Sequence, residues 1–208
     1  NPIYNWKEHR QSNFKWWKER IKINEKRFDL LRIDHFRAII SGWCINYGSE
    51  NAINGYWKRG PGKMLLENIL EIMPSERLIA EDLGHITNSV KKIIKQFDLK
   101  GMRVLQFGYS DDKKNEHHHE NIDQNTACYI GTHDNNTTRG WFKENKLKNQ
   151  SKTFKSLVKE NKINESNCSK KMMEIGMNTN ADYFIITIQD IMNLNETYRT
   201  NVPGLNEG

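Results

Sequence analysis

The chain has 208 residues, of which 36% are hydrophobic and 28% charged, a balance that supports an ordinary folded domain and excludes intrinsic disorder. It contains no run of 18 apolar residues and its first residues do not resemble a signal peptide, so we expect a cytoplasmic protein with no membrane association. The net charge of +6 is spread along the whole chain rather than gathered into a basic stripe with interleaved aromatics, which argues against nucleic-acid binding.

The cysteines and histidines do not suggest a metal site. Cys44, Cys128 and Cys168 are odd in number and lack the spacing of metal ligands, so we expect reduced, mostly buried thiols. The adjacent histidines at positions 117–119 cannot all face one metal ion from a regular strand or helix, and we interpret them as part of a loop.

The N-terminal third begins with a helix. Phe14, Trp17 and Ile21 have helical spacing, and Ser12 or Asn13 can serve as the N-cap. A first strand is expected over residues 27–34.

Residues 39–63 are expected to form a long loop that is rich in glycine and aromatic residues, which is typical of a binding element or lid. Exposed aromatic rings suit the apolar faces of pyranose sugars, and Trp57 is our candidate for substrate binding from this segment. The alternative is a loop folded on its own aromatic residues.

The remaining two thirds alternate helices and strands. The expected elements are a helix over 65–73, a strand over 77–81, a helix capped by Thr87, a strand over 99–107, a polar loop over 108–125, a strand over 126–131, helices over 137–178, a strand over 181–188 and a loop over 195–204. Five strands alternating with helices predict an α/β fold with parallel strands. A complete eight-unit TIM barrel needs roughly 250 residues. The chain also lacks an initiating Met, so we expect residues 1–208 to be a single portion of the catalytic barrel, the C-terminal part of a (β/α)8 barrel without its first strands.

Three of these strands are each followed or ended by an acid: Asp34, Glu81 and Asp134. The carboxyl ends of parallel strands meet at one rim, where the sites of such folds lie, so we expect the three acids to converge there. Arg32 lies on the same face of its strand as Asp34 and would hold that carboxylate ionised. The alternative is a strand that ends in a surface salt bridge.

Two carboxylates in different environments are the groups that cleave a glycosidic bond. Asp34, held by Arg32, is the expected nucleophile, and Glu81, which follows an apolar run, is the expected proton donor. His133 and Asp134 would hydrogen-bond sugar hydroxyls and support the positive charge that develops on the ring. In a retaining enzyme the nucleophile and the proton donor lie about 5 to 5.5 Å apart. If the acceptor is a sugar hydroxyl, the reaction is transfer rather than hydrolysis.

Several motifs along the chain closely resemble those of glycoside hydrolase family 77, the 4-α-glucanotransferases of the α-amylase superfamily. They are Asn1-Pro2-Ile3-Tyr4-Asn5-Trp6, Arg32-Ile33-Asp34-His35-Phe36-Arg37, Gly60-Pro61-Gly62, Ile79-Ala80-Glu81-Asp82-Leu83-Gly84, Val104-Leu105-Gln106-Phe107, the run from Gly131 to Trp141, and Gln189-Asp190. The motifs occur in the family's order over nearly the whole chain.

This resemblance implies a (β/α)8 barrel that transfers α-1,4-glucan segments with retention, from maltodextrins derived from starch or glycogen to glucose or another glucan, without a cofactor. By position it assigns Asp34 as nucleophile, Glu81 as general acid/base and Asp134 as transition-state stabiliser. It places Arg32 and His133 among the substrate-binding neighbours of these acids. Asn201, in the tail motif Asn-x-Pro-Gly, matches a substrate-loop residue.

Two other readings remain open. One is a hydrolase of the same superfamily, and the other is a glucan-binding fragment without catalysis. The segments that would supply the first three strands, another substrate-binding Asp and part of the acceptor site are absent from the sequence. We therefore expect residues 1–208 alone to be inactive.

Overall fold

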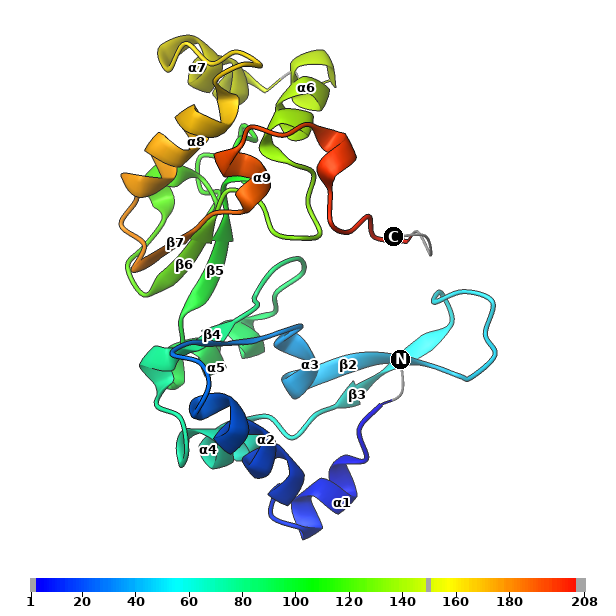
Figure 1. The fold of residues 1–208 in the computed structure, drawn as a ribbon. Coiled ribbons are helices and arrows are strands. Elements are labelled where there is room, and N and C mark those ends of the chain that lie inside the picture. The colour runs from blue at the N-terminus through cyan, green and yellow to red at the C-terminus, as the bar shows by residue number, and fades with distance from the viewer. Residues whose placement is uncertain (1–2, 149–150, 205–208) are drawn as a thin grey trace. The chain divides into compact units, whose positions relative to one another are not determined.

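The computed structural model describes residues 3–148 and 151–204, and the chain divides into two units, Asn1–Gly101 and Met102–Gly208 (Figure 1). Each unit buries its own cluster of apolar side chains. Asn1 and Pro2, which open the first family motif, lie outside the described residues. The longest helices of the described part, α2 and α6, have 11 residues each, too few to cross a membrane, which takes about 20.

The first unit carries two of the five expected strands, together with helices and a hairpin. In chain order they are α1 (Trp6–Gln11), α2 (Lys15–Glu25), β1 (Leu31–Ile33), α3 (Arg37–Ile40), β2 (Ser41–Ile45), β3 (Gly55–Arg59), α4 (Lys63–Leu70), the 3-10 turn η1 (Ser75–Arg77), β4 (Leu78–Ala80) and α5 (Asn88–Gln96). The apolar face of α4 places Leu65, Leu66 and Ile69 in the core, and all three are at most 1% exposed. Helical spacing in the sequence therefore predicted the buried face of this helix correctly.

Strands β1 and β4 run parallel, with Leu31 opposite Leu78 and Ile33 opposite Ala80. Lys100 extends this ladder on the other side of β4, because its carbonyl accepts a hydrogen bond from the Ala80 N–H at 2.7 Å. The carboxyl ends of β1 and β4 are therefore level with each other.

The predicted first strand is wrong in its first half. Only Leu31–Ile33 pairs as a strand, because the Arg77 guanidinium donates hydrogen bonds to the carbonyls of Glu25, Phe28 and Asp29 and holds residues 26–29 in a turn after α2. The backbone acceptors that a longer strand would offer to a neighbour are occupied by one side chain.

The predicted N-cap of the second helix is also wrong. Helix α2 begins at Lys15, and its N-cap is Phe14, which makes no side-chain capping bond. Asn13 and Phe14 both have positive φ, at 49° and 53°, and the Ser12 hydroxyl donates back to the carbonyl of Glu8 at the end of α1. Burial of the Phe14 ring, which is 1% exposed, stabilises this sharp turn of the chain between α1 and α2.

The expected loop over residues 39–63 is a β-hairpin. Strands β2 and β3 pair antiparallel with Trp43 opposite Trp57, and the hairpin extends away from the helices of its unit (Figure 1). The Trp43 indole N–H donates to the carbonyl of Ala52 at 2.8 Å and closes the turn. Gly55 lies against the Cys44 carbonyl and the Trp43 ring, where a Cβ would have no room. The alternation of small and aromatic residues therefore marked strands rather than a loop.

The second unit holds the rest of the α/β pattern. Its elements are β5 (Gly101–Val104), which starts at the boundary, the 3-10 turns η2 (Leu105–Phe107) and η3 (His119–Asn121), β6 (Thr126–Tyr129), α6 (Thr138–Lys148), α7 (Lys152–Glu160), α8 (Cys168–Met177), β7 (Tyr183–Ile185), α9 (Ile188–Ile191) and η4 (Glu196–Tyr198). Strands β5, β6 and β7 lie side by side in that order (Figure 1). The parallel pair β6–β7 has Cys128 opposite Phe184, and Gly176 lets α8 pack closely on the Phe184 ring.

The expectation of reduced, buried thiols is confirmed. Cys44, Cys128 and Cys168 are free and at most 3% exposed. Burial raises the pKa of the Cys128 thiol to about 12, which keeps it protonated and unreactive at neutral pH.

Candidate active site

Asp34 and Glu81 directly follow neighbouring parallel strands at the same end. Ile33 is paired with Ala80 in the register of β1 and β4. Beyond that pair, the Glu81 N–H donates to the Ile33 carbonyl at 3.0 Å and the Phe36 N–H donates to the Glu81 carbonyl at 3.3 Å. The backbone of Glu81 is thus tied on both sides to the segment that carries Asp34, so the two acids follow neighbouring strand ends. That their carboxyl groups meet around one sugar stays a prediction.

Arg32 forms the ion pair that was expected with Asp34. Its Nη2 lies 2.8 Å from Oδ1 of Asp34, and the side chain of Asp34 remains 76% exposed. His35 follows with φ of 45°, a left-handed conformation that turns the chain at once into α3. A positive φ at a non-glycine residue stores strain and is a frequent feature of functional sites. The carboxylate is therefore oriented but open to a ligand.

Glu81 is half-buried, in contrast to Asp34. Its Oε1 accepts a hydrogen bond from the Leu83 N–H at 3.1 Å, inside a turn that continues to Gly84 with φ of 76°. The two carboxyl groups at this strand edge thus have different surroundings, which is the arrangement that separates the roles of an acid and a nucleophile.

Asp134 lies in the loop between β6 and α6, in the second unit. The Asn135 side-chain oxygen accepts from both the backbone N–H and the hydroxyl of Thr132, at 2.9 and 2.8 Å, which closes a tight turn around Asp134. Within this turn Nε2 of His133 lies 3.5 Å from Oδ2 of Asp134. Both side chains are more than half exposed, so they too are accessible to a ligand.

The C-terminal tail reaches Asp134. The Asn201 amide donates to Oδ1 of Asp134 at 2.6 Å, and the Arg199 guanidinium donates to the Asp134 backbone carbonyl at 3.1 Å. Asn201 was predicted as a site residue only from the tail motif, and the structure places it against a catalytic candidate. Arg199 was missed, since neither spacing nor motif distinguished it from the other basic residues of the chain.

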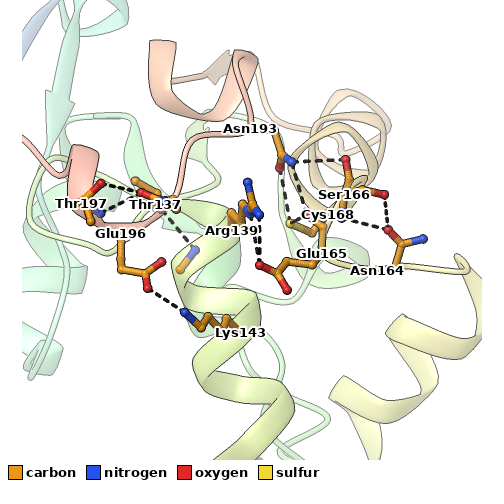
Figure 2. Close-up of polar contacts among 12 residues, drawn as sticks. Thr137, Arg139, Lys143, Asn164, Glu165, Ser166, Cys168, Asn193, Glu196 and Thr197 are labelled. Atoms are coloured by element: carbon orange, nitrogen blue, oxygen red, sulfur yellow. Dashed lines mark hydrogen bonds and ion pairs between the residues drawn. The ribbon is translucent and has the colours of Figure 1, made fainter.

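A polar network holds the tail to α6 (Figure 2). Lys143 on α6 pairs with Glu196 of η4 at 2.9 Å, and Asn195 caps η4 by accepting from the N–H and the hydroxyl of Thr197. Arg139, also on α6, pairs separately with Glu165 before α8, at 3.2 Å. Through the Lys143–Glu196 pair the segment that carries Arg199 and Asn201 is held to the helix that follows Asp134.

Trp57 lies on strand β3 of the hairpin rather than in a loop. Its ring meets Trp43 edge to face at a centroid distance of 5.2 Å, and the Arg37 guanidinium lies 4.5 Å from its ring centre. The side chain remains 53% exposed. An aromatic ring that is fixed by its neighbours and still open to solvent can bind an apolar face of a sugar.

The predicted residues form two sets. Arg32, Asp34 and Glu81 come together in the first unit, whereas His133, Asp134 and Asn201 come together in the second. That both sets meet around one substrate stays a prediction.

Two of the three adjacent histidines accept hydrogen bonds from backbone N–H groups. Nδ1 of His117 accepts from the Val104 N–H at 3.2 Å, and Nδ1 of His118 accepts from the Glu120 N–H at 3.4 Å. In the part of the chain that the structure describes, no group of three His, Cys, Asp or Glu side chains could hold a metal ion.

Comparison with known proteins gives one consistent result. All 208 residues match a family model described as 4-alpha-glucanotransferase. The 4-alpha-glucanotransferase of Aquifex aeolicus (strain VF5) is 39% identical over 207 residues, covering 98% of this chain and 41% of the relative. The chloroplastic/amyloplastic 4-alpha-glucanotransferase of Solanum tuberosum is 38% identical over 208 residues, covering 100% of this chain and 36% of the relative.

Among solved structures, the amylomaltase from Streptococcus agalactiae in complex with acarbose superposes with a TM-score of 0.87 at 30% identity, covering 98% of this chain and 41% of that one. The mixed α/β fold with parallel strands is therefore similar to that of an amylomaltase. This chain spans about two fifths of the length of these relatives. Since the family model matches from the first residue to the last, the chain belongs to the 4-alpha-glucanotransferase family.

Proposed function

We propose that this chain carries the catalytic acids of a 4-α-glucanotransferase, which moves an α-1,4-linked segment from a donor maltodextrin to the 4-hydroxyl of glucose or another glucan. The observation that carries the proposal is the parallel pairing of β1 and β4, which makes Asp34 and Glu81 neighbours at the same strand end. A retaining mechanism needs its two carboxyl groups about 5 to 5.5 Å apart, a spacing that fits adjacent strands.

In this mechanism Asp34 attacks the anomeric carbon of the donor sugar while the glycosidic C–O bond breaks. Glu81 gives its proton to the leaving oxygen, and the leaving glucan departs. The covalent glycosyl-aspartate is then attacked by the acceptor 4-hydroxyl, whose proton returns to Glu81. The ion pair with Arg32 at 2.8 Å supports the nucleophilic role, because it holds the carboxylate of Asp34 in a fixed orientation.

The second set of residues would bind and stabilise the sugar ring. Asp134 supports the positive charge of the oxocarbenium-like transition state, and His133 and Asn201 bind hydroxyl groups. Trp57 offers an exposed ring to a further sugar of the glucan. The acarbose complex of the Streptococcus agalactiae amylomaltase supports an α-glucan as the ligand.

We further infer that the two units are portions of one catalytic (β/α)8 barrel and form its C-terminal part. The parallel strand pairs in each unit and the similarity to an amylomaltase support this architecture. The acids suffice for the chemistry, so the mechanism requires no cofactor.

Maltotriose tests the reaction, with the natural polypeptide that contains residues 1–208 as the enzyme. We expect glucose together with a ladder of longer maltodextrins, since only a transferase builds products longer than its donor. Glucose and maltose without the ladder would favour the hydrolase reading. Asp34→Asn should abolish both products, whereas Asp29→Asn, at an exposed residue in the turn before β1, should leave them unchanged. Normal turnover in Asp34→Asn would overturn the proposal.

Residues 1–208 expressed alone should be inactive, because the acceptor side of the site is expected from segments that the relatives have beyond the matched part. Glucose release from maltotriose by this piece would contradict that expectation.

A further inference from the structure

We propose that Asp190 is a positioning residue for Asp134. The inference rests on the proposed function, in which Asp134 stabilises the transition state. Asp190 lies in α9 and is 2% exposed, and its Oδ1 accepts a hydrogen bond from the backbone N–H of Thr138, the first residue of α6, at 3.0 Å. This bond links residues that are 52 positions apart in the chain.

The first N–H groups of a helix have no partner within the helix, and leaving one buried without a partner is costly. In α6 the Thr137 hydroxyl accepts from the Gly140 N–H at 3.1 Å, which leaves the Thr138 N–H to Asp190. Thr138 is itself fully buried, so solvent does not reach this N–H group while Asp190 is in place. The start of α6 therefore depends on a carboxyl group from α9.

Only three residues separate Thr138 from Asp134, so a shift at the start of α6 is passed along a short backbone to the carboxylate. The Gln106 amide donates to the Asn136 carbonyl at 2.9 Å within this stretch and limits how the loop can absorb such a shift. The Thr132–Asn135 turn closes the loop on its strand side.

Helix α9 also reaches Asp134 from the other direction. Gln189, next to Asp190, donates to the Tyr198 carbonyl at 3.3 Å. Arg199 follows directly and donates to the Asp134 carbonyl, and Asn201 donates to its carboxylate. Helix α9 thus contacts both the loop that carries Asp134 and the tail that binds Asp134. Its contact with the loop side is the buried hydrogen bond between Asp190 and Thr138.

The test compares Asp190→Asn, which keeps a side-chain oxygen as acceptor, with Asp190→Leu, which has similar size and no acceptor. In the natural polypeptide that contains residues 1–208, we expect Asp190→Leu to lower kcat for maltotriose disproportionation by about 10- to 100-fold with KM within about threefold, because small misplacement of a catalytic group has effects of this size. Asp190→Asn should remain within about threefold of the unchanged protein. If the leucine variant does not fold, the same kinetic measurement is made on Asp190→Ser, whose side chain is polar but shorter than that of Asp.

Thr126→Val is the matched control. Thr126 is 4% exposed and its hydroxyl donates to the Asp123 carbonyl at 2.7 Å, at the opposite end of β6 from the Asp134 loop. This variant loses a buried hydrogen bond in the same unit, so it reports the effect of lost stability alone. We expect its kcat to be unchanged.

Amide hydrogen exchange supplies a readout that does not require activity. Exchange of the Thr138 N–H and of residues 132–137 should be faster in the Asp190→Leu or Asp190→Ser variant and unchanged in Thr126→Val. Unchanged exchange, or faster exchange with unaltered kcat, would overturn the positioning role. If the unsubstituted protein does not disproportionate maltotriose, the proposed function fails, and the exchange result still decides whether Asp190 fixes the loop.

Discussion

The two acidic regions of this molecule hold their carboxylates by different means. Asp34 and Glu81 are aligned by the backbone, because they follow paired residues of adjacent parallel strands. Asp134 lies in a loop between β6 and α6, where side chains from distant segments contact it. The first arrangement depends on strand register for its backbone and on one ion pair, Arg32–Asp34, for the nucleophile's side chain, whereas the second depends on hydrogen bonds from distant segments. Substitutions in the first region therefore test mainly the chemical roles of Asp34 and Glu81. Substitutions in the second region test how Asp134 is held in place.

The largest effect on turnover is expected from Glu81, whose proposed role is proton transfer rather than positioning. Glu81→Gln preserves shape and the backbone contacts, so it should remove only proton transfer and lower turnover of maltotriose by about 10²- to 10⁴-fold. A donor with fluoride as its leaving group needs no protonation, so α-maltosyl fluoride should restore the first step in Glu81→Gln and fail to do so in Asp34→Asn. Glu76→Gln, at an exposed residue of η1, is the control. Equal rescue of both variants would show that the two roles are wrongly assigned.

A smaller effect is expected from the ion pair that orients Asp34. Arg32→Ala should lower kcat/KM by about 10-fold or more, since a hydrogen bond to a charged group contributes roughly 1.5 to 3 kcal/mol. The matched control is Lys22→Ala, which removes an exposed pair with Glu19 on α2. Steady-state kinetics with maltotriose measure both variants. If Arg32→Ala behaves like the control, strand register alone places the nucleophile.

In the second region, Asn201→Ala should lower kcat by about 5- to 10-fold, because it removes one hydrogen bond to an exposed carboxylate. Asn201→Asp should be worse, since it sets a second negative charge beside Asp134. Asn178→Ala, which removes a side-chain bond to the Glu174 carbonyl at the end of α8, serves as the control. An Asn201→Asp variant with normal kcat would contradict the contact with Asp134.

The smallest effect is expected from the Lys143–Glu196 pair, which is exposed. A double-mutant cycle with Lys143→Ala and Glu196→Gln should give a coupling of at most about twofold in kcat, and less at high salt, as is usual for surface ion pairs. Coupling above tenfold would mean that the Lys143–Glu196 pair, rather than α9, holds the tail in position against Asp134.

The same pair has a defined pH window. The pKa of Glu196 lies below its ordinary value of 4.5, chiefly because the backbone N–H of Glu196 donates a hydrogen bond to the carboxylate and next because the Lys143 ammonium does so. In turn, the hydrogen bond with Glu196 raises the pKa of Lys143 above its ordinary value of 10.5. The stabilisation from Glu196 is therefore present above pH 4.5 and lost as the pH falls through the lowered value, and that from Lys143 is lost as the pH rises through its raised value. Thermal unfolding of the Glu196→Gln variant should differ from that of the unchanged protein near pH 7 and coincide with it at pH 2.

Much of the site could be read from local sequence because the relevant signals are short in range. An apolar strand followed by an acid predicts where Asp34, Glu81 and Asp134 lie on their own elements, and spacing by two residues predicted the Arg32 pair. The same reasoning failed for residues 41–59, where glycine-rich and aromatic sequence suggested a loop. There the pairing of Trp43 with Trp57 and the room left by Gly55 stabilise a hairpin, and these contacts join residues about a dozen positions apart.

The arrangement around Asp134 was decided by the folded chain. Nothing in the local sequence near Thr138 indicates that its N–H is bound by Asp190, and nothing near Asp134 indicates that Arg199 donates to its carbonyl. Periodicity and motif spacing report the face or the end of an element on which a residue lies. They carry no information on which distant segment packs there, because that choice is made by close packing and by the need to satisfy buried polar groups across the whole unit.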